Sequence, residues 1–271
     1  MNSRLQGISA KVQRAEENIR KLNDEITAFL SRNPNPYNVT GEFENNGLEY
    51  VVKAYGKLDI PLRFSVIFGE IIHHLRSVFD YLICALVEEQ SGTPTRAHKF
   101  PVCFSASEFA ETSMNGCIDG ISASAVTLIE SVQPYNTEIP TTCILGVLTE
   151  LDNTDKHQLL ILFNTVVGVQ PIIPVGQAND SPDTTNPAIK LISPPDTHSR
   201  VASNEGVEVF RVGLTAPDPS FYVDAKVSTK ITFQIGGLPD YLDIVPTLTT
   251  MLQYTARTIK KFSTEFRTIP W

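Results

Sequence analysis

The sequence predicts an α+β protein: a helical bundle around a central apolar helix, a strand hairpin, a C-terminal antiparallel sheet, and a helix that closes the chain. Apolar residues recur at steps of three and four along residues 5–29 and again along 63–89, a spacing typical of packed helices. Residues 161–235 are instead rich in β-branched and aromatic types, with Pro- and Asp-rich turns between the runs, which favours strands. This segregation of helices from strands favours α+β over alternating α/β.

The first predicted helix carries an apolar seam with heptad spacing. Its members are Leu5, Ile8, Val12, Ala15, Ile19, Leu22, Ile26 and Phe29. Such a seam is typical of packing against one other helix at a shallow angle, as in a coiled coil. The helix that packs against this seam could belong to the same chain or to another subunit. A homodimer through the helix at residues 5–29 is therefore one expectation. The helix is predicted to end at residues 33–36, where two prolines interrupt the pattern.

A strand hairpin is predicted near residues 39–54, followed by the central helix. Strand-like residues at 39–44 and 48–54 flank Asn45-Asn46-Gly47, and Asn-Gly tolerates the positive φ of a tight hairpin. The helix predicted over residues 63–89 carries apolar side chains around most of its circumference. We therefore expect it to be buried at the centre of the bundle.

The remaining elements follow from apolar runs and the turns between them. Helices are predicted at residues 106–111, 122–131, 141–160 and 243–266, and strands at 161–173, 188–193, 207–214 and 223–235. Pro246 falls in the first turn of the last helix, where proline is accepted. The elements predict one domain over residues 1–271, mainly helical to residue 160 and strand-rich over 161–235.

Composition excludes several classes of protein. The chain has 271 residues and a formal net charge of −8, which argues against extended nucleic-acid binding. Its four cysteines are scattered, as buried free thiols would be. No apolar signal-peptide core and no stretch long enough to span a membrane is evident, so we expect a cytoplasmic protein. No phosphate loop or dinucleotide motif is present, and no cofactor is predicted.

Polar side chains interrupt the apolar faces of two predicted helices. On the helix at 63–89 they include His73, Arg76 and Asp80, which share one face. On the helix at 141–160 they are Asp152, Asn153, Lys156 and His157. Charges in apolar surroundings must be paired or change their pKa. We therefore expect pairs across the helix interface, Arg76 with Asp152 and Asp80 with Lys156.

This polar cluster has a structural and a functional interpretation. In the structural one it is a buried ion network that sets helix register. In a functional one, a small anionic ligand such as a nucleotide is bound by His73, Arg76, Asp80, Asp152 and Lys156. In another, His157 transfers a proton in a hydrolase or nuclease, helped by Arg76 and Asn153. Because no catalytic motif is recognisable, a non-enzymatic binding or interaction protein is the first hypothesis. No metal site is predicted.

Four motifs in this order resemble a block found in a widespread set of uncharacterised bacterial proteins. They are GEIIHHLRSVFDYL at residues 69–82, Phe100-Pro101, LIESVQPY at 128–135 and LDNTDKH at 151–157. The resemblance covers roughly residues 10–160 and includes the heptad helix and the hairpin. That family carries no established activity, so the resemblance implies no reaction.

A weaker similarity is to HEPN-type helical domains, many of which are metal-independent ribonucleases. Their active sites pair an arginine and a histidine of one helix across a dimer. Here Asn153-x-x-x-His157 lacks the arginine, and Arg76 would have to supply it from another helix. The similarity implies a HEPN-like ribonuclease as an alternative function.

Overall fold

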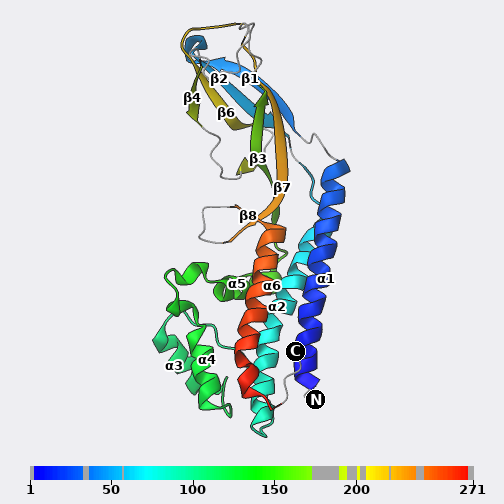
Figure 1. Cartoon of the computed structure of the whole chain (residues 1–271), viewed down its shortest axis with the longest axis vertical. Helices are drawn as coiled ribbons and strands as arrows, with labels where there is room; N and C mark the ends of the chain where they lie inside the picture. Colours follow the sequence, from blue (N-terminus) through cyan, green and yellow to red (C-terminus); the bar gives the residue numbers. More distant parts are fainter. Residues whose placement is uncertain are drawn as a thin grey trace. The chain divides into compact units, whose positions relative to one another are not determined.

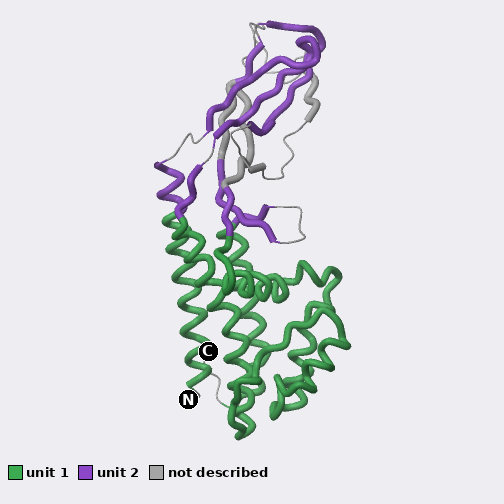
Figure 2. The backbone as a smooth tube through the Cα atoms, turned by 180° about the vertical axis from the view of Figure 1, so that it is seen from behind, with its two compact units in different colours: residues 1–25, 62–160, 244–271 green, residues 26–61, 161–243 purple. Residues whose placement is uncertain are grey.

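The computed structural model of this chain (Figure 1) describes residues 3–32, 37–56, 58–172, 189–193, 200–201, 206–219, 221–235 and 241–267. The fold is α+β, as the sequence predicts, and among these residues α-helices accompany two four-stranded antiparallel sheets. The chain forms two compact units (Figure 2). The helical unit comprises residues 1–25, 62–160 and 244–271, and the sheet unit comprises 26–61 and 161–243.

The helical unit is organised around α2. Its α-helices are α1 (Ser3–Arg32, up to residue 25), α2 (Leu62–Glu89), α3 (Ala106–Met114), α4 (Ala123–Ser131), α5 (Ile144–His157) and α6 (Ile244–Lys261), with short 3-10 turns η2 (Pro134–Asn136), η3 (Pro140–Thr142) and η4 (Phe262–Glu265). Helix α2 contacts both α5 and α6. Phe68, Leu75 and Phe79 are among its fully buried side chains. The prediction of a buried central helix is therefore confirmed.

The heptad seam of α1 is buried within this chain. Six side chains of the seam are buried: Leu5, Ile8, Ala15, Ile19, Leu22 and Ile26. Polar contacts join α1 to α2, because Arg4 pairs with Glu88 at 2.5 Å and Asn18 donates to Glu70 at 3.3 Å. A helix of the same chain is thus one neighbour of the seam, and the homodimer stays a prediction. The predicted helix end at residues 33–36 lies outside the described residues.

The sheet unit contains two sheets. One has the order β1-β2-β6-β4, and the other has the order β5-β3-β7-β8. The strands are β1 (Asn38–Glu44), β2 (Glu49–Tyr55), β3 (Leu162–Ile172), β4 (Ile189–Ser193), β5 (Arg200–Val201), β6 (Val207–Leu214), β7 (Asp224–Gln234) and β8 (Tyr241–Asp243). All pairings are antiparallel. A core of Tyr50, Val52, Phe210 and Val212 lies in the first sheet.

The predicted hairpin forms, but it belongs to the sheet unit. Strands β1 and β2 pair along their whole length, with Asn38 opposite Tyr55 at one end and Glu44 opposite Glu49 at the other. The 3-10 turn η1 (Asn45–Gly47) joins them. Asn45, Asn46 and Gly47 all have positive φ, which explains the Asn-Asn-Gly sequence. Because β2 also pairs with β6, which in turn pairs with β4, the hairpin is the start of a sheet that β6 and β4 complete. The sequence pattern had placed it with the helical part.

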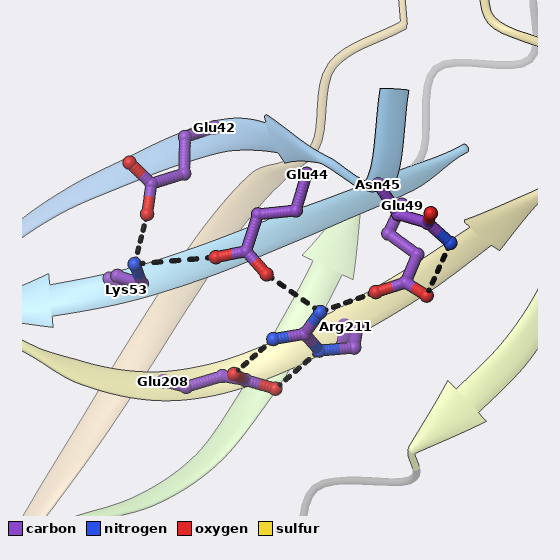
Figure 3. A network of polar contacts seen from close by, with 7 residues as sticks. All are labelled: Glu42, Glu44, Asn45, Glu49, Lys53, Glu208 and Arg211. Carbon is purple, nitrogen blue, oxygen red and sulfur yellow. Dashed lines mark hydrogen bonds and ion pairs between the residues drawn. The ribbon is translucent and has the colours of Figure 1, made fainter. Parts of the chain in front are cut away.

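A charged network crosses three strands of this sheet (Figure 3). The Arg211 guanidinium donates to both carboxylate oxygens of Glu208, at 2.9 and 2.7 Å. It also pairs with Glu44 at 2.9 Å and with Glu49 at 2.5 Å. The ammonium of Lys53 pairs with Glu42 and Glu44. These contacts, which we call the Arg211 network, join β1, β2 and β6.

Two further predictions can be compared with the described residues. Cys84, Cys103, Cys117 and Cys143 are free, and the last three are buried, which confirms the expectation of free thiols. Burial raises the pKa of the Cys103 and Cys117 thiols, so both are poor nucleophiles. Among the helices that the structure describes, none combines the length and the apolar character needed to cross a membrane.

Candidate functional site

Arg76 and Asp80 hold the backbone of Phe100. Arg76 donates to Asp80 at 2.9 Å and to the Phe100 carbonyl oxygen at 3.0 Å. The Phe100 amide donates to Asp80 at 2.9 Å, and its ring lies 5.1 Å from that of Phe79. The side chain of Arg76 is only 11% exposed. One turn of α2 therefore satisfies both backbone polar groups of a buried residue, a structural task.

Gln133 holds the same segment from its other side. It is fully buried, and its amide nitrogen donates to the carbonyl oxygens of Pro101 and Ile129, at 3.1 and 2.9 Å. Its amide oxygen accepts from the Cys103 amide at 2.9 Å. Three of the four sequence motifs, at residues 69–82, 100–101 and 128–135, thus contribute to fixing residues 100–103. The sequence analysis includes Gln133 only as a member of the LIESVQPY motif.

The cross-helix pairs predicted from the sequence are wrong, although the two polar groups do meet. Arg76 pairs with Asp80 on its own helix and not with Asp152, because the Phe100 loop occupies that side of α2. The contact between helices is made instead by His73, whose Nδ1 lies 3.0 Å from Asp152 Oδ1. Lys156 pairs with the other oxygen of Asp152 at 2.6 Å and not with Asp80.

Asp152 is the buried centre of this second network. Its side chain is 6% exposed, whereas His73 and Lys156 are about half exposed. Both of its oxygens are used, so the carboxylate orients the imidazole and the ammonium at once. A neutral His73 that donates its Nδ1 hydrogen to Asp152 keeps Nε2 as a hydrogen-bond acceptor. The carboxylate would therefore present His73 in one tautomer.

A groove of about 560 Å³ opens beside this network, where the last turn of α5 approaches α2. It is lined by Val66, Gly69, Glu70, His73, Asp155, Lys156, His157, Gln158 and Leu159. Of the residues predicted for ligand binding or catalysis, His73, Lys156 and His157 line it. Asp152 lies behind it through its contacts with His73 and Lys156. Arg76, Asp80 and Asn153 are not among the lining residues, and Asn153 is exposed.

Gly69 makes room for an acidic group that the sequence analysis did not single out. A Cβ built on Gly69 would overlap the carboxylate of Asp155. Glycine inside a helix costs about 1 kcal/mol relative to alanine, so its presence in α2 has a packing reason here. The available signal was this interior glycine together with Asp155 three residues after Asp152.

The carboxylate of Asp155 is partly desolvated and has no hydrogen-bond or ion-pair partner among the residues that the structure describes. Burial raises its pKa, the nearby charge of Asp152 raises it further, and His73 opposes the shift. No residue in the described part of the chain donates a hydrogen bond to it or forms an ion pair with it. The groove therefore contains an ionisable group whose bonding capacity is unused, beside an oriented imidazole. Three His, Cys, Asp or Glu side chains able to hold a metal do not converge anywhere in the described ranges.

Comparisons with known proteins add no assignment. Neither a family model, nor a curated protein, nor a solved structure matches this chain.

Proposed function

We propose that this chain is a binding protein whose helical unit takes a small ligand in the groove between α2 and α5. The observation that carries the proposal is the Asp155 carboxylate, which lines the groove and has no partner in the described part of the chain. The groove has a volume of about 560 Å³, which is typical of small-molecule sites. Apolar side chains of Val66 and Leu159 line the same groove, as expected of such sites.

The Asp152 network supports this function by holding the walls of the groove together. Asp152 joins α2 to α5 through His73. Residues fixed by packing and hydrogen bonds lose less freedom when a ligand binds, which favours affinity. The interpretation of the cluster as a structural ion network and its interpretation as a site are then compatible.

A ribonuclease built from Arg76 and His157 has less support. Arg76 already donates to Asp80 and to a backbone carbonyl oxygen, so its guanidinium is poorly placed to stabilise a phosphate. A ligand site for a nucleotide is weakened in the same way, because Lys156 is paired with Asp152. These contacts are why we favour a binding protein over the two alternatives.

A groove-blocking variant tests the proposal. Val66 lines the groove and is 48% exposed, so Val66→Trp fills the groove without disturbing the core. Leu62→Trp is the matched control, because Leu62 lies one turn earlier on α2, is 73% exposed and is not among the lining residues. Ligand-observed NMR with a fragment library should detect fragments that bind the unmodified chain and Leu62→Trp but not Val66→Trp. Fragments that bind all three proteins equally, or none, would refute the proposal.

A further inference from the structure

The charges around the groove leave an acidic surplus. Asp152 is neutralised by Lys156 and bound to His73. Glu70 accepts a hydrogen bond from the neutral amide of Asn18, which cancels none of its charge. Asp155 forms no ion pair and accepts no hydrogen bond among the described residues. The groove is therefore better suited to a positive group than to a negative one.

The end of α5 acts in the same direction. The helix ends at His157, and the last backbone bond of this turn runs from the Gln158 amide to the Thr154 carbonyl oxygen at 2.9 Å. The last carbonyl groups of a helix have no later turn to bind and carry the negative end of its dipole. Residues 155–159 line the groove, so this negative end lies at its wall.

The groove also has an apolar wall. Val66 and Leu159 line it while 48% and 43% exposed. Large apolar side chains that remain exposed beside a polar group are typical of a site for a ligand with both kinds of surface.

We propose that the ligand is an organic amine with an apolar body, a conclusion that rests on the proposed function of the groove. The ammonium group binds the Asp155 carboxylate and donates a second hydrogen bond to Nε2 of His73, which is an acceptor when Nδ1 donates to Asp152. The hydrocarbon part lies against Val66 and Leu159. The half-exposed ammonium of Lys156 also lines the groove, but it is already paired with Asp152.

Three probes of equal chain length isolate the head group: hexylamine, hexanol and hexanoate, with methylamine as the probe that lacks a body. Isothermal titration calorimetry should find that hexylamine binds most tightly. Each buried methylene strengthens binding by about fourfold, so methylamine should bind far more weakly. Inorganic phosphate serves as the anionic probe for the alternative ligand class.

Two charge-matched variants of α5 isolate Asp155. Asp155→Asn should weaken hexylamine binding by about tenfold or more, because a hydrogen bond to a charged group is lost. Glu150→Gln removes the same charge from an exposed position of α5 outside the groove, and it should leave binding unchanged. Far-UV circular dichroism checks that both variants are folded.

The outcomes separate this inference from the function on which it rests. If hexanoate, hexanol or phosphate binds as tightly as hexylamine and Val66→Trp abolishes that binding, the groove is a site and the amine inference is wrong. Hexylamine binding that is equal in Asp155→Asn and Glu150→Gln also overturns the inference. If no probe and no library fragment binds, the proposed function itself fails.

Discussion

The Arg211 network of the sheet unit and the groove of the helical unit both gather charges, but they use them differently. In the first, one guanidinium and one ammonium serve four glutamates, so each carboxylate has a cation (Figure 3). In the second, Asp152 is fully used while Asp155 beside it has no described partner. A saturated network stabilises a fold, whereas a group with unused capacity inside a groove is available to a ligand. The pairing of the charged groups, more than their number, separates a structural network from a site.

The Arg76 contacts are a second saturated network, and breaking them should have the largest effect. Arg76→Ala leaves the Phe100 carbonyl without its donor and Asp80 without its cation, so that only the Phe100 amide still donates to Asp80. We expect a loss of about 3 kcal/mol, the lower end for a buried pair because Asp80 is part exposed. Arg63→Ala is the control, because Arg63 pairs with Glu25 on an exposed surface of the same helix and should cost under about 1 kcal/mol. Urea denaturation followed by far-UV circular dichroism measures both. Equal losses would contradict the structural role of Arg76.

Removing the guanidinium of Arg211 from the sheet network should reduce the stability of the fold by less. Arg211→Ala leaves Glu44, Glu49 and Glu208 close together without their shared partner. We expect a loss of about 1–2 kcal/mol, because these carboxylates remain partly solvated. Adding Glu44→Gln and Glu49→Gln to Arg211→Ala should recover part of the stability, since fewer like charges then repel. A triple variant less stable than Arg211→Ala would show that the hydrogen bonds matter more than the charges. Chemical denaturation and hydrogen exchange of β2 and β6 report the change.

The sequence predicted the elements better than their partners. Periodicity located α1, α2 and α6, because a buried helical face depends on local spacing. The hairpin was placed near its observed residues, but its assignment to the sheet unit depends on β6, more than 150 residues later along the chain. The strand β8 was not predicted, because three residues carry too little pattern.

The site was predicted in part for a similar reason. Polar residues on apolar helices identified α2 and α5 as the helices that meet, and His73 and Lys156 line the groove there. The pairing was missed because Arg76 is directed to Phe100 by a loop that no local pattern reveals. Asp155 was missed because its character comes from burial against Gly69, which requires the packing of two helices to be known.

The unused carboxylate of Asp155 should itself reduce the stability of the fold slightly, whereas the saturated networks increase it. The pKa of Asp155 is raised in the folded state, so the folded chain retains this proton to higher pH than the unfolded chain does. Its contribution to stability is therefore complete below the unfolded pKa and is lost as the pH rises through the folded pKa. At neutral pH Asp155→Asn should be more stable than the unmodified chain, by about 0.5 kcal/mol because the group is part exposed. Thermal unfolding at neutral and acidic pH measures the difference.

The measurement at acidic pH tests whether the charge of Asp155 causes this difference in stability. The advantage of Asp155→Asn should disappear at a pH where Asp155 is protonated in both states. Glu150→Gln, which removes an exposed charge from the same helix, should show no such change. A stabilisation that is independent of pH would mean that asparagine packs better than aspartate against Gly69. The charge of the Asp155 carboxylate would then not be what destabilises the fold.

The smallest effect is expected at His157, the residue first proposed as a catalyst. His157 is exposed at the end of α5, and no other described side chain contacts it through a hydrogen bond or an ion pair. His157→Ala should therefore change folding stability by no more than about 0.5 kcal/mol and hexylamine affinity by no more than about twofold, in the range of an exposed contact. The same variant decides the alternative function, because a ribonuclease that uses His157 as its base would lose its cleavage of RNA. Binding retained without any RNA cleavage in either protein would leave the groove as a ligand site, and cleavage that depends on His157 would make it an active site.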